Sequence, residues 1–184
     1  MGSSSDYTAD MARGRISISN LAEANLIVQK IINYEKSPPT DPNFYSSGLN
    51  CAEFQDYNND NYADRRFSRT SEDVRNYMLY NQSFNVDRVY YTSPSDNPTH
   101  YNNGSYGSGE PLPFYLRKPF FQWNGSANDV INGINSGKLY VLHRDHGSTS
   151  GWGKPSFKTN NISSLTNGNK LPVMFSINCS SGNF

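Results

Sequence analysis

Apolar residues recur at helical spacing near the start of the chain, at Leu21, Ala24, Ile27, Ile31 and Tyr34. This period predicts an amphipathic helix. Asn20 stands before the helix and Glu23 follows three residues later, which is a capping-box pattern. Similar signals predict a second helix that begins at Thr70 and runs to about residue 80, and a short third helix over residues 128–135.

Short runs of apolar and β-branched residues predict five strands, at residues 15–18, 48–52, 86–91, 139–142 and 171–177. A polar loop is expected at residues 56–64 and a long Ser/Pro/Asn/Gly-rich loop at residues 93–112. Because strands alternate with helices, right-handed crossovers and a mainly parallel sheet covered on both faces are expected. The predicted fold is therefore a three-layer α/β sandwich.

Composition narrows the class of protein. The 184 residues suffice for one domain with a sizeable core, and 13 Tyr and 10 Phe indicate that much of this core is aromatic. Sixteen basic and sixteen acidic side chains cancel, so neither nucleic acid nor an anionic membrane is expected as a partner. The sequence holds no apolar run near the roughly 18 residues that span a bilayer. Two cysteines are too few for a disulfide scaffold, although they could pair with each other.

Candidate chemistry follows two of the predicted strands. Residues 139–142 lead into His146 and Gly147, and residues 171–177 lead into Cys179. If these two strands are neighbours, both side chains emerge at the same edge of the sheet. An imidazole beside a thiol can generate a nucleophilic thiolate, and the N–H of a glycine can approach the substrate oxygen. On spacing alone, a surface histidine and a buried, inert cysteine are the alternative interpretation.

Longer segments resemble the gingipain family of cysteine peptidases. The stretch from His146 to Phe157 resembles the family's His-Gly-Ser motif, which is followed by a Trp and a Phe. Residues 165–172 resemble the segment before its catalytic strand, and residues 177–184 resemble its cysteine motif, with Asn183 in place of an acidic residue. The resemblance implies a caspase-like sandwich in which Cys179 is the nucleophile, His146 the general base and Gly147 the oxyanion glycine.

The same resemblance implies two further site residues, Glu53 and Asp64, and Trp152 is a third candidate for substrate binding. Glu53 matches a glutamate that lies near the catalytic histidine of the family. Asp64 falls at about the spacing of the acidic residue in the S1 pocket of arginine-specific members, where a carboxylate would bind a guanidinium. The alternative is that Asp64 is one acid of a polar loop and is neutralised by the adjacent Arg65 and Arg66. Trp152 is expected either to line the site or to belong to the core.

The resemblance also sets expectations for the domain. Residues 1–12 are interpreted as an appended start or an upstream linker, and residues 13–184 as a peptidase domain that is incomplete at both ends and stops just after Cys179. An incomplete sheet leaves an open edge. The expected partners are therefore the rest of the peptidase domain or a second chain, together with a protein or peptide substrate.

The most favoured function is a secreted or surface cysteine endopeptidase of a bacterium that cleaves after Arg or Lys, its export signal lying outside this chain. The alternatives are a gingipain-like sortase of a secretion system and a non-catalytic homologue that serves as a surface interaction module. A carbohydrate- or peptide-binding surface protein ranks last, since it does not explain the two motifs. No cofactor is required and no catalytic metal site is expected. A structural calcium ion is considered for the loop containing Asp56, Asn58 and Asp60, although it lacks an EF-hand's Gly and Glu.

Overall fold

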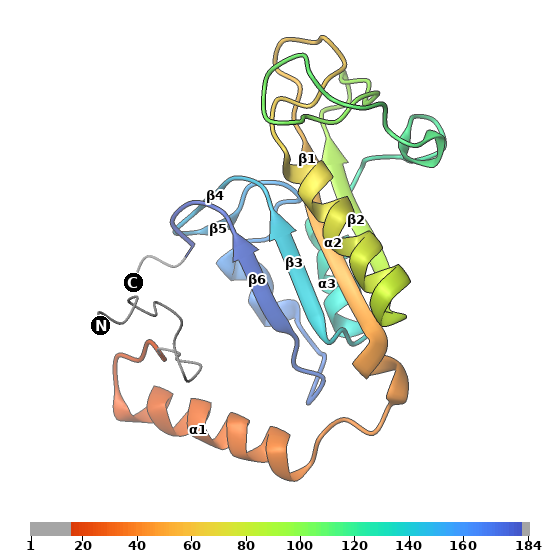
Figure 1. Ribbon diagram of the computed structural model, residues 1–184. Coiled ribbons are helices and arrows are strands. Elements are labelled where there is room, and N and C mark those ends of the chain that lie inside the picture. Colours follow the sequence, from red (N-terminus) through yellow and green to blue (C-terminus); the bar gives the residue numbers. More distant parts are fainter. Residues whose placement is uncertain (1–15, 182–184) are drawn as a thin grey trace, which may run out of the picture.

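Four parallel strands form the central sheet of the protein, whose computed structural model describes residues 16–181. The strand order is β2-β1-β3-β6, and Figure 1 shows the sheet in the middle of the molecule. The strands are β1 (Ser47–Phe54), β2 (Asn85–Thr92), β3 (Tyr140–Arg144) and β6 (Val173–Ile177). A small antiparallel pair, β4 (Gly147–Ser148) and β5 (Gly151–Trp152), follows β3.

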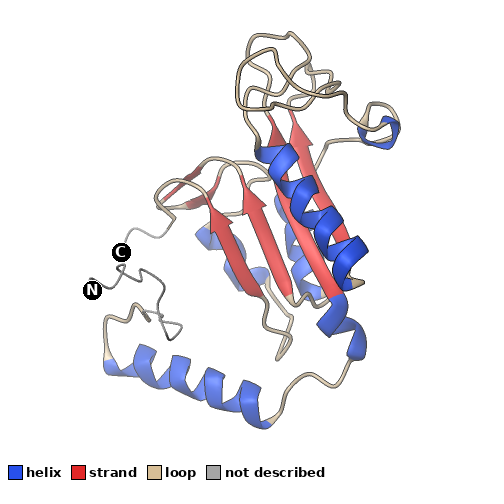
Figure 2. Ribbon diagram, viewed as in Figure 1, coloured by secondary structure: helices blue, strands red, loops and turns tan. Residues whose placement is uncertain are grey.

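Two helices cover opposite faces of this sheet, as Figure 2 shows. The helix α2 (Phe67–Gln82) lies on one face and α3 (Ala127–Asn135) on the other. The described residues also contain three short 3-10 helices: η1 (Pro42–Ser46), η2 (Phe114–Leu116) and η3 (Thr159–Ser164). The predicted three-layer α/β sandwich with a mainly parallel sheet is thus confirmed.

Alternating side chains of the strands supply both cores, as expected for a sheet buried on two faces. On the α3 face, Leu49, Val89 and Val141 pack with residues of α3, while on the α2 face Val86, Tyr140 and Leu142 form a second cluster. Gly48 permits the close packing of the second cluster, since a Cβ atom there would lie 2.3 Å from the ring of Tyr140.

The helix starts show how far local signals reach. Ser126 caps α3 and forms a complete capping box with Asp129. The predicted second helix begins three residues before Thr70, at Phe67, because Phe67 and Ser68 are buried and extend the helix into the core. Asp73 forms an ion pair with Arg69 one turn earlier instead of marking a helix start.

The first helix, α1 (Leu21–Lys36), begins as predicted, with Asn20 accepting a hydrogen bond from the backbone N–H of Glu23. None of its residues is buried, and Figure 1 shows it apart from the sheet. The predicted strand at residues 15–18 is wrong for residues 16–18, which lie in irregular backbone and do not join the sheet. The segment expected at residues 1–12 lies outside the described residues.

Strand β6 forms one edge of the sheet and is exposed along its whole length. Val173, Phe175 and Ile177 are each about half exposed (56%, 50% and 48%). They border an apolar hollow of about 450 Å³ that also involves α2 and β3. Among residues 16–181 the sheet therefore presents an uncovered apolar edge.

Candidate active site

The carboxyl ends of β3 and β6 bring the two predicted catalytic segments together. The strands are parallel neighbours, with Arg144 opposite Ile177. A Cβ atom on Gly147 would lie 2.6 Å from the side chain of Asn178 and 2.9 Å from the carbonyl oxygen of Cys179. The loop holding His146 thus touches the loop holding Cys179, and only a glycine fits between them. Cys179 is exposed and its thiol is free, as is the thiol of the buried Cys51.

The imidazole of His146 is held from two sides. Its Nε2 atom lies 2.8 Å from Oε1 of Gln55, which directly follows β1. The ring of Phe67, at the start of α2, meets the imidazole edge to face at a centroid distance of 5.2 Å. Two elements far from β3 in the sequence therefore fix the position of the candidate base.

Asp64 is buried against this arrangement rather than isolated in its loop. Its Oδ2 atom accepts a hydrogen bond from the backbone N–H of Tyr57 at 2.8 Å and another from Nε2 of Gln55 at 3.3 Å. The backbone N–H of Asp64 donates to the carbonyl of Gln55 at 2.7 Å. The structure therefore links Asp64 to His146 through a single side chain, that of Gln55.

A hollow of about 260 Å³ lies beside Asp64. The guanidinium groups of Arg65, Arg66 and Arg144 also border it, and none of them forms an ion pair within residues 16–181. Arg144 lies over the ring of Phe67, with Cζ 4.9 Å from the centroid. Three cations around one carboxylate make the hollow electropositive overall, which opposes a basic ligand unless these flexible side chains turn outward.

Glu53 points to Asp145 and makes no hydrogen bond to His146. Burial, with the charge and hydrogen bond of Asp145, raises the pKa of Glu53 to about 8. A neutral Glu53 carboxyl can therefore donate its proton toward Asp145, whose buried Oδ1 atom accepts no other hydrogen bond within residues 16–181. The Oδ2 atom of Asp145 accepts a bond from the backbone N–H of Lys154 at 2.5 Å. This carboxyl pair anchors the segment that carries His146.

His143 is fully buried and belongs to the support of the site. Its Nε2 atom faces the carbonyl oxygen of Lys154 at 3.1 Å, and its Nδ1 atom lies 2.7 Å from Nδ2 of Asn178. Since a carbonyl only accepts, Nε2 carries the hydrogen and Nδ1 accepts from Asn178. Both nitrogens are occupied, so His143 does not compete with His146 as a base. It holds the residue that precedes Cys179.

Trp152 lies in the core on the α3 side of the sheet. It is 5% exposed, stacks on His143 and donates from Nε1 to Oγ of Ser176 at 2.8 Å. Its aromatic contacts are with His143 and Phe157 rather than with His146. Its indole therefore supports the end of β6 from within the core.

In the acidic loop after β1, the carboxylates accept hydrogen bonds from the loop's own backbone N–H groups. Asp56 accepts from the backbone N–H groups of Asp60 and Asn61, and Asp60 accepts from that of Tyr62. Within residues 16–181, no group of three His, Cys, Asp or Glu side chains is arranged to hold a metal ion. The loop is folded by these internal hydrogen bonds.

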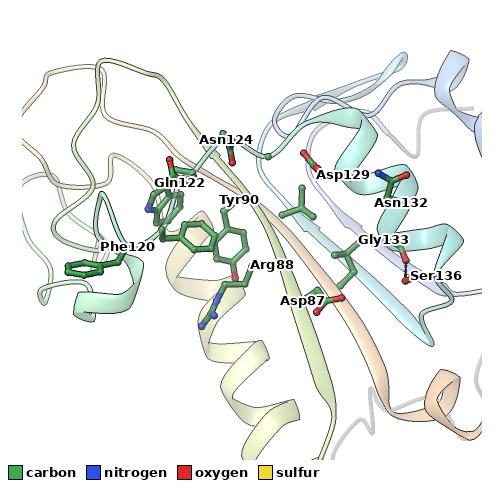
Figure 3. A pocket seen from close by; sticks show the side chains of 15 residues that line it. Asp87, Arg88, Tyr90, Phe120, Gln122, Asn124, Asp129, Asn132, Gly133 and Ser136 are labelled. Carbon is green, nitrogen blue, oxygen red and sulfur yellow. Dashed lines mark hydrogen bonds between the residues drawn. The ribbon is translucent and has the colours of Figure 1, made fainter.

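A larger hollow, of about 610 Å³, lies away from these residues, between β2, α3 and residues 120–125 (Figure 3). Side chains from β2, residues 120–125 and α3 border it. Its charged groups already have partners, since Arg88 pairs with Glu72, Asp87 with Lys138, and Asp129 caps α3. None of the candidate site residues borders this hollow.

Sequence reasoning did not find Gln55, Asp145 or Phe67 as contributors. The only available signal for Gln55 was its position two residues after Glu53, on the same side of an extended segment at the carboxyl end of a strand. The role of Phe67 depends on where α2 crosses the sheet, which no local pattern reveals.

Comparison with known proteins settles the family. The model of peptidase family C25 matches residues 1–184. The chain belongs to this family. This membership confirms the resemblance to the gingipain family of cysteine peptidases that the sequence motifs indicated. Among residues 16–181, no helix has the length and apolarity needed to cross a membrane.

Curated relatives match a short part of the chain. Gingipain R2 of Porphyromonas gingivalis is 38% identical over 59 residues, which is 32% of this chain and 8% of the relative. Gingipain R1 of the same species is also 38% identical over 59 residues, covering 6% of its length. The matched part is thus only a small fraction of the length of either relative.

Two solved structures share the fold. The crystal structure of the Arg-specific cysteine proteinase gingipain R has a TM-score of 0.63 and 20% identity, covering 92% of this chain and 32% of that chain. The complex of the pro- and mature domains of Porphyromonas gingivalis RgpB has a TM-score of 0.61 and 19% identity, covering 90% and 32%. These likenesses confirm the caspase-like architecture.

Proposed function

We propose that this chain carries the catalytic centre of a cysteine endopeptidase. The observation that supports the proposal is the contact between Gly147 and the Asn178–Cys179 segment at the ends of two neighbouring parallel strands. The exposed thiol of Cys179 and the contact of Nε2 of His146 with Gln55, which leaves Nδ1 of the imidazole for the thiol, support the proposal as well. Membership of family C25 supports the same assignment.

In the proposed reaction, His146 takes the proton from Sγ of Cys179, and the thiolate attacks the carbonyl carbon of the scissile peptide bond. The backbone N–H of Gly147 donates to the oxyanion that forms. The imidazolium then returns its proton to the leaving amine nitrogen, and the C–N bond breaks. Water, deprotonated by His146, hydrolyses the resulting thioester and releases the acid product and the free thiol.

We further propose a basic P1 residue, the residue before the cleaved bond, with Asp64 as its counter-charge. The acidic side chain borders the 260 Å³ hollow, and no hydrogen bond reaches its Oδ1 atom from within residues 16–181. The three guanidinium groups around the hollow oppose this assignment, so probes with a charged and with a neutral P1 side chain test it directly. Glu53 acts in this proposal through Asp145, and Trp152 through the packing of β6.

The proposed partners are a protein or peptide substrate and a further segment that covers β6, either the rest of a peptidase domain or a second chain. The exposed Val173, Phe175 and Ile177 support such a cover. Secretion or display on a bacterial surface is proposed from the gingipain relatives. A structural calcium ion near Asp56 is a secondary proposal, opposed by the internal hydrogen bonds of that loop.

Two alternatives use the same fold. A sortase would pass the acyl group from Cys179 to an amine instead of water, and a product with a new amide bond would identify it. A non-catalytic homologue would keep the fold without a reactive thiol. The exposed free thiol of Cys179 favours the catalytic forms over this second alternative.

The deciding experiment is covalent labelling of the full-length protein with an arginyl acyloxymethyl ketone, followed by intact-mass measurement. A norleucyl probe of similar size is the control for the P1 charge, and Cys179→Ala is the control for the nucleophile. One adduct that is lost in Cys179→Ala, with faster labelling by the arginyl probe, is expected. Equal labelling by both probes would reject Asp64 as the P1 counter-charge, and no adduct on the folded protein would reject the peptidase assignment.

A further inference from the structure

We propose that Gln55 is a positioning residue that fixes the tautomer of His146 and joins the imidazole to the carboxylate of Asp64. The inference rests on the proposed function and adds a residue that neither the sequence motifs nor the family resemblance identified. Its basis is one side-chain amide that lies between two groups of different hydrogen-bonding character.

The geometry is simple. Nε2 of Gln55 lies 3.3 Å from Oδ2 of Asp64, and Oε1 of Gln55 lies 2.8 Å from Nε2 of His146. Gln55 is 5% exposed and Asp64 is 7% exposed, so water competes little for these bonds. Asp64 is held in turn by the backbone N–H of Tyr57.

The chemistry of the three groups fixes the direction of every proton. An ionised carboxylate only accepts hydrogen bonds, so the NH₂ group of Gln55 must face Asp64. The amide oxygen must then face His146, and because this oxygen also only accepts, Nε2 of the imidazole must carry a hydrogen. In neutral His146 the lone pair is consequently on Nδ1, where it can take the proton of a thiol.

In this arrangement the buried carboxylate of Asp64 also orients the amide of Gln55, in addition to its proposed role in substrate binding. An isolated imidazole in water would exchange between its two tautomers, whereas the amide of Gln55 selects the one with a basic Nδ1. The same carboxylate is the proposed contact for a basic P1 group. A ligand at Asp64 and the orientation of His146 are therefore connected through one side-chain amide, that of Gln55.

The backbone makes the amide a rigid connection. Gln55 directly follows the central strand β1, and its carbonyl accepts from the N–H of Asp64. The two residues are thus fixed to each other by the main chain as well as by their side chains. No comparable bond reaches His146 from Glu53, whose carboxyl pairs with Asp145.

The test combines nitrogen NMR of the histidines with kinetics, in the full-length protein with ¹⁵N-histidine. The His146 resonances are assigned by their loss in His146→Gln. In its neutral form, wild-type His146 is expected to show a protonated Nε2 and a bare Nδ1. In Gln55→Met both hydrogen bonds are removed, so a mixture of tautomers is expected, with kcat lowered about 10- to 100-fold and KM changed by less than about threefold. Gln82→Met, on the exposed end of α2, is the matched control and should change neither.

Gln55→Glu provides the conservative comparison. A carboxylate at this position still accepts from Nε2 of His146, so the tautomer is expected to persist. The new negative charge favours the protonated imidazole, so the acidic limb of the pH–rate profile is expected to shift upward. A wild-type His146 that carries its hydrogen on Nδ1, or a Gln55→Met protein with unchanged tautomer and kcat, would overturn the proposal. The wild-type spectrum decides the point even if Gln55→Met does not fold. Because the spectrum is independent of turnover, failure of the labelling experiment rejects the peptidase function without deciding the role of Gln55.

Discussion

The imidazole of His143 lies flat against the indole of Trp152, with ring centroids 4.2 Å apart and planes 4° apart. This stack is buried beneath the candidate active site and connects β3 to β5. It explains why Trp152 of the recognised motif and the preceding His143 are structural supports, because each bonds a residue at or just beyond the end of β6, before Cys179.

Stability in acid should depend on His143. Burial lowers the pKa of His143 to about 4 from an ordinary value of 6.5, so the folded state keeps it neutral where the unfolded state binds a proton. The free energy of unfolding is therefore expected to fall as the pH drops from about 6.5 to 4, by on the order of 2–3 kcal/mol from this group. Urea unfolding at pH 7 and pH 4.5 measures this difference. His143→Leu should flatten this dependence and His100→Gln should retain it; an unchanged slope in His143→Leu would show that other groups cause it.

The free energy of unfolding should depend on pH in the opposite direction through Glu53. Its pKa is raised to about 8, so between about pH 4.5 and 8 the folded state binds a proton that the unfolded state has lost. Stability is consequently expected to decrease as the pH rises through this range. The variant Glu53→Gln keeps a neutral, hydrogen-bonding side chain beside Asp145 and should remove most of the decrease. Thermal unfolding at pH 5 and pH 8 checks this, and equal slopes in both proteins would show that Glu53 is ionised when folded.

Gly147→Ala is expected to abolish most activity while leaving the core intact. The added Cβ atom would lie 2.6 Å from the side chain of Asn178 and 2.9 Å from the carbonyl oxygen of Cys179, so the two loops must separate. A loss of about 100-fold in kcat/KM is expected for a displacement near 1 Å. Ser150→Ala, an exposed change in the same turn, is the control. Retention of wild-type kcat/KM by Gly147→Ala would argue against an oxyanion role for this glycine.

The open edge of the sheet predicts self-association of the isolated chain. Phe175 is half exposed on β6 and borders the apolar hollow beside α2. Placing a charge on an edge strand blocks pairing between chains, so Phe175→Lys should shift sedimentation profiles toward monomer with little loss of stability. Phe114 is equally apolar but lies on η2 and is 70% exposed, so Phe114→Lys should leave association unchanged. Equal effects of the two variants would point to general surface stickiness.

Local sequence patterns predicted most of the fold but only part of the site. Helix caps such as Asn20 act over three or four residues, and buried strands such as residues 139–142 are recognisable by their own composition. The start of α2 was misplaced because Phe67 is drawn into the helix by burial against other elements. The contact of Gln55 with His146 joins β1 to the end of β3, and glutamine carries no signal for such a role. Long-range hydrogen bonds of this kind become visible only when the strand order is known.

The strand order β2-β1-β3-β6 also has a consequence for how the chain reaches this state. Of the four strands, β1 is synthesised first, but its partner β3 is far away in the sequence, as the pairing of Gly48 with Tyr140 shows. Strand β6 pairs only with β3, so it can join the sheet only after β3 is in place. Parallel pairing between distant strands loses the entropy of long loops before the strand contacts contribute stability. Folding is therefore expected to be slow, and apolar strands stay unpaired until it is complete. During synthesis, α2 and β2 are the first elements able to shield β1, and β6, which leads to Cys179, joins the sheet only after β3.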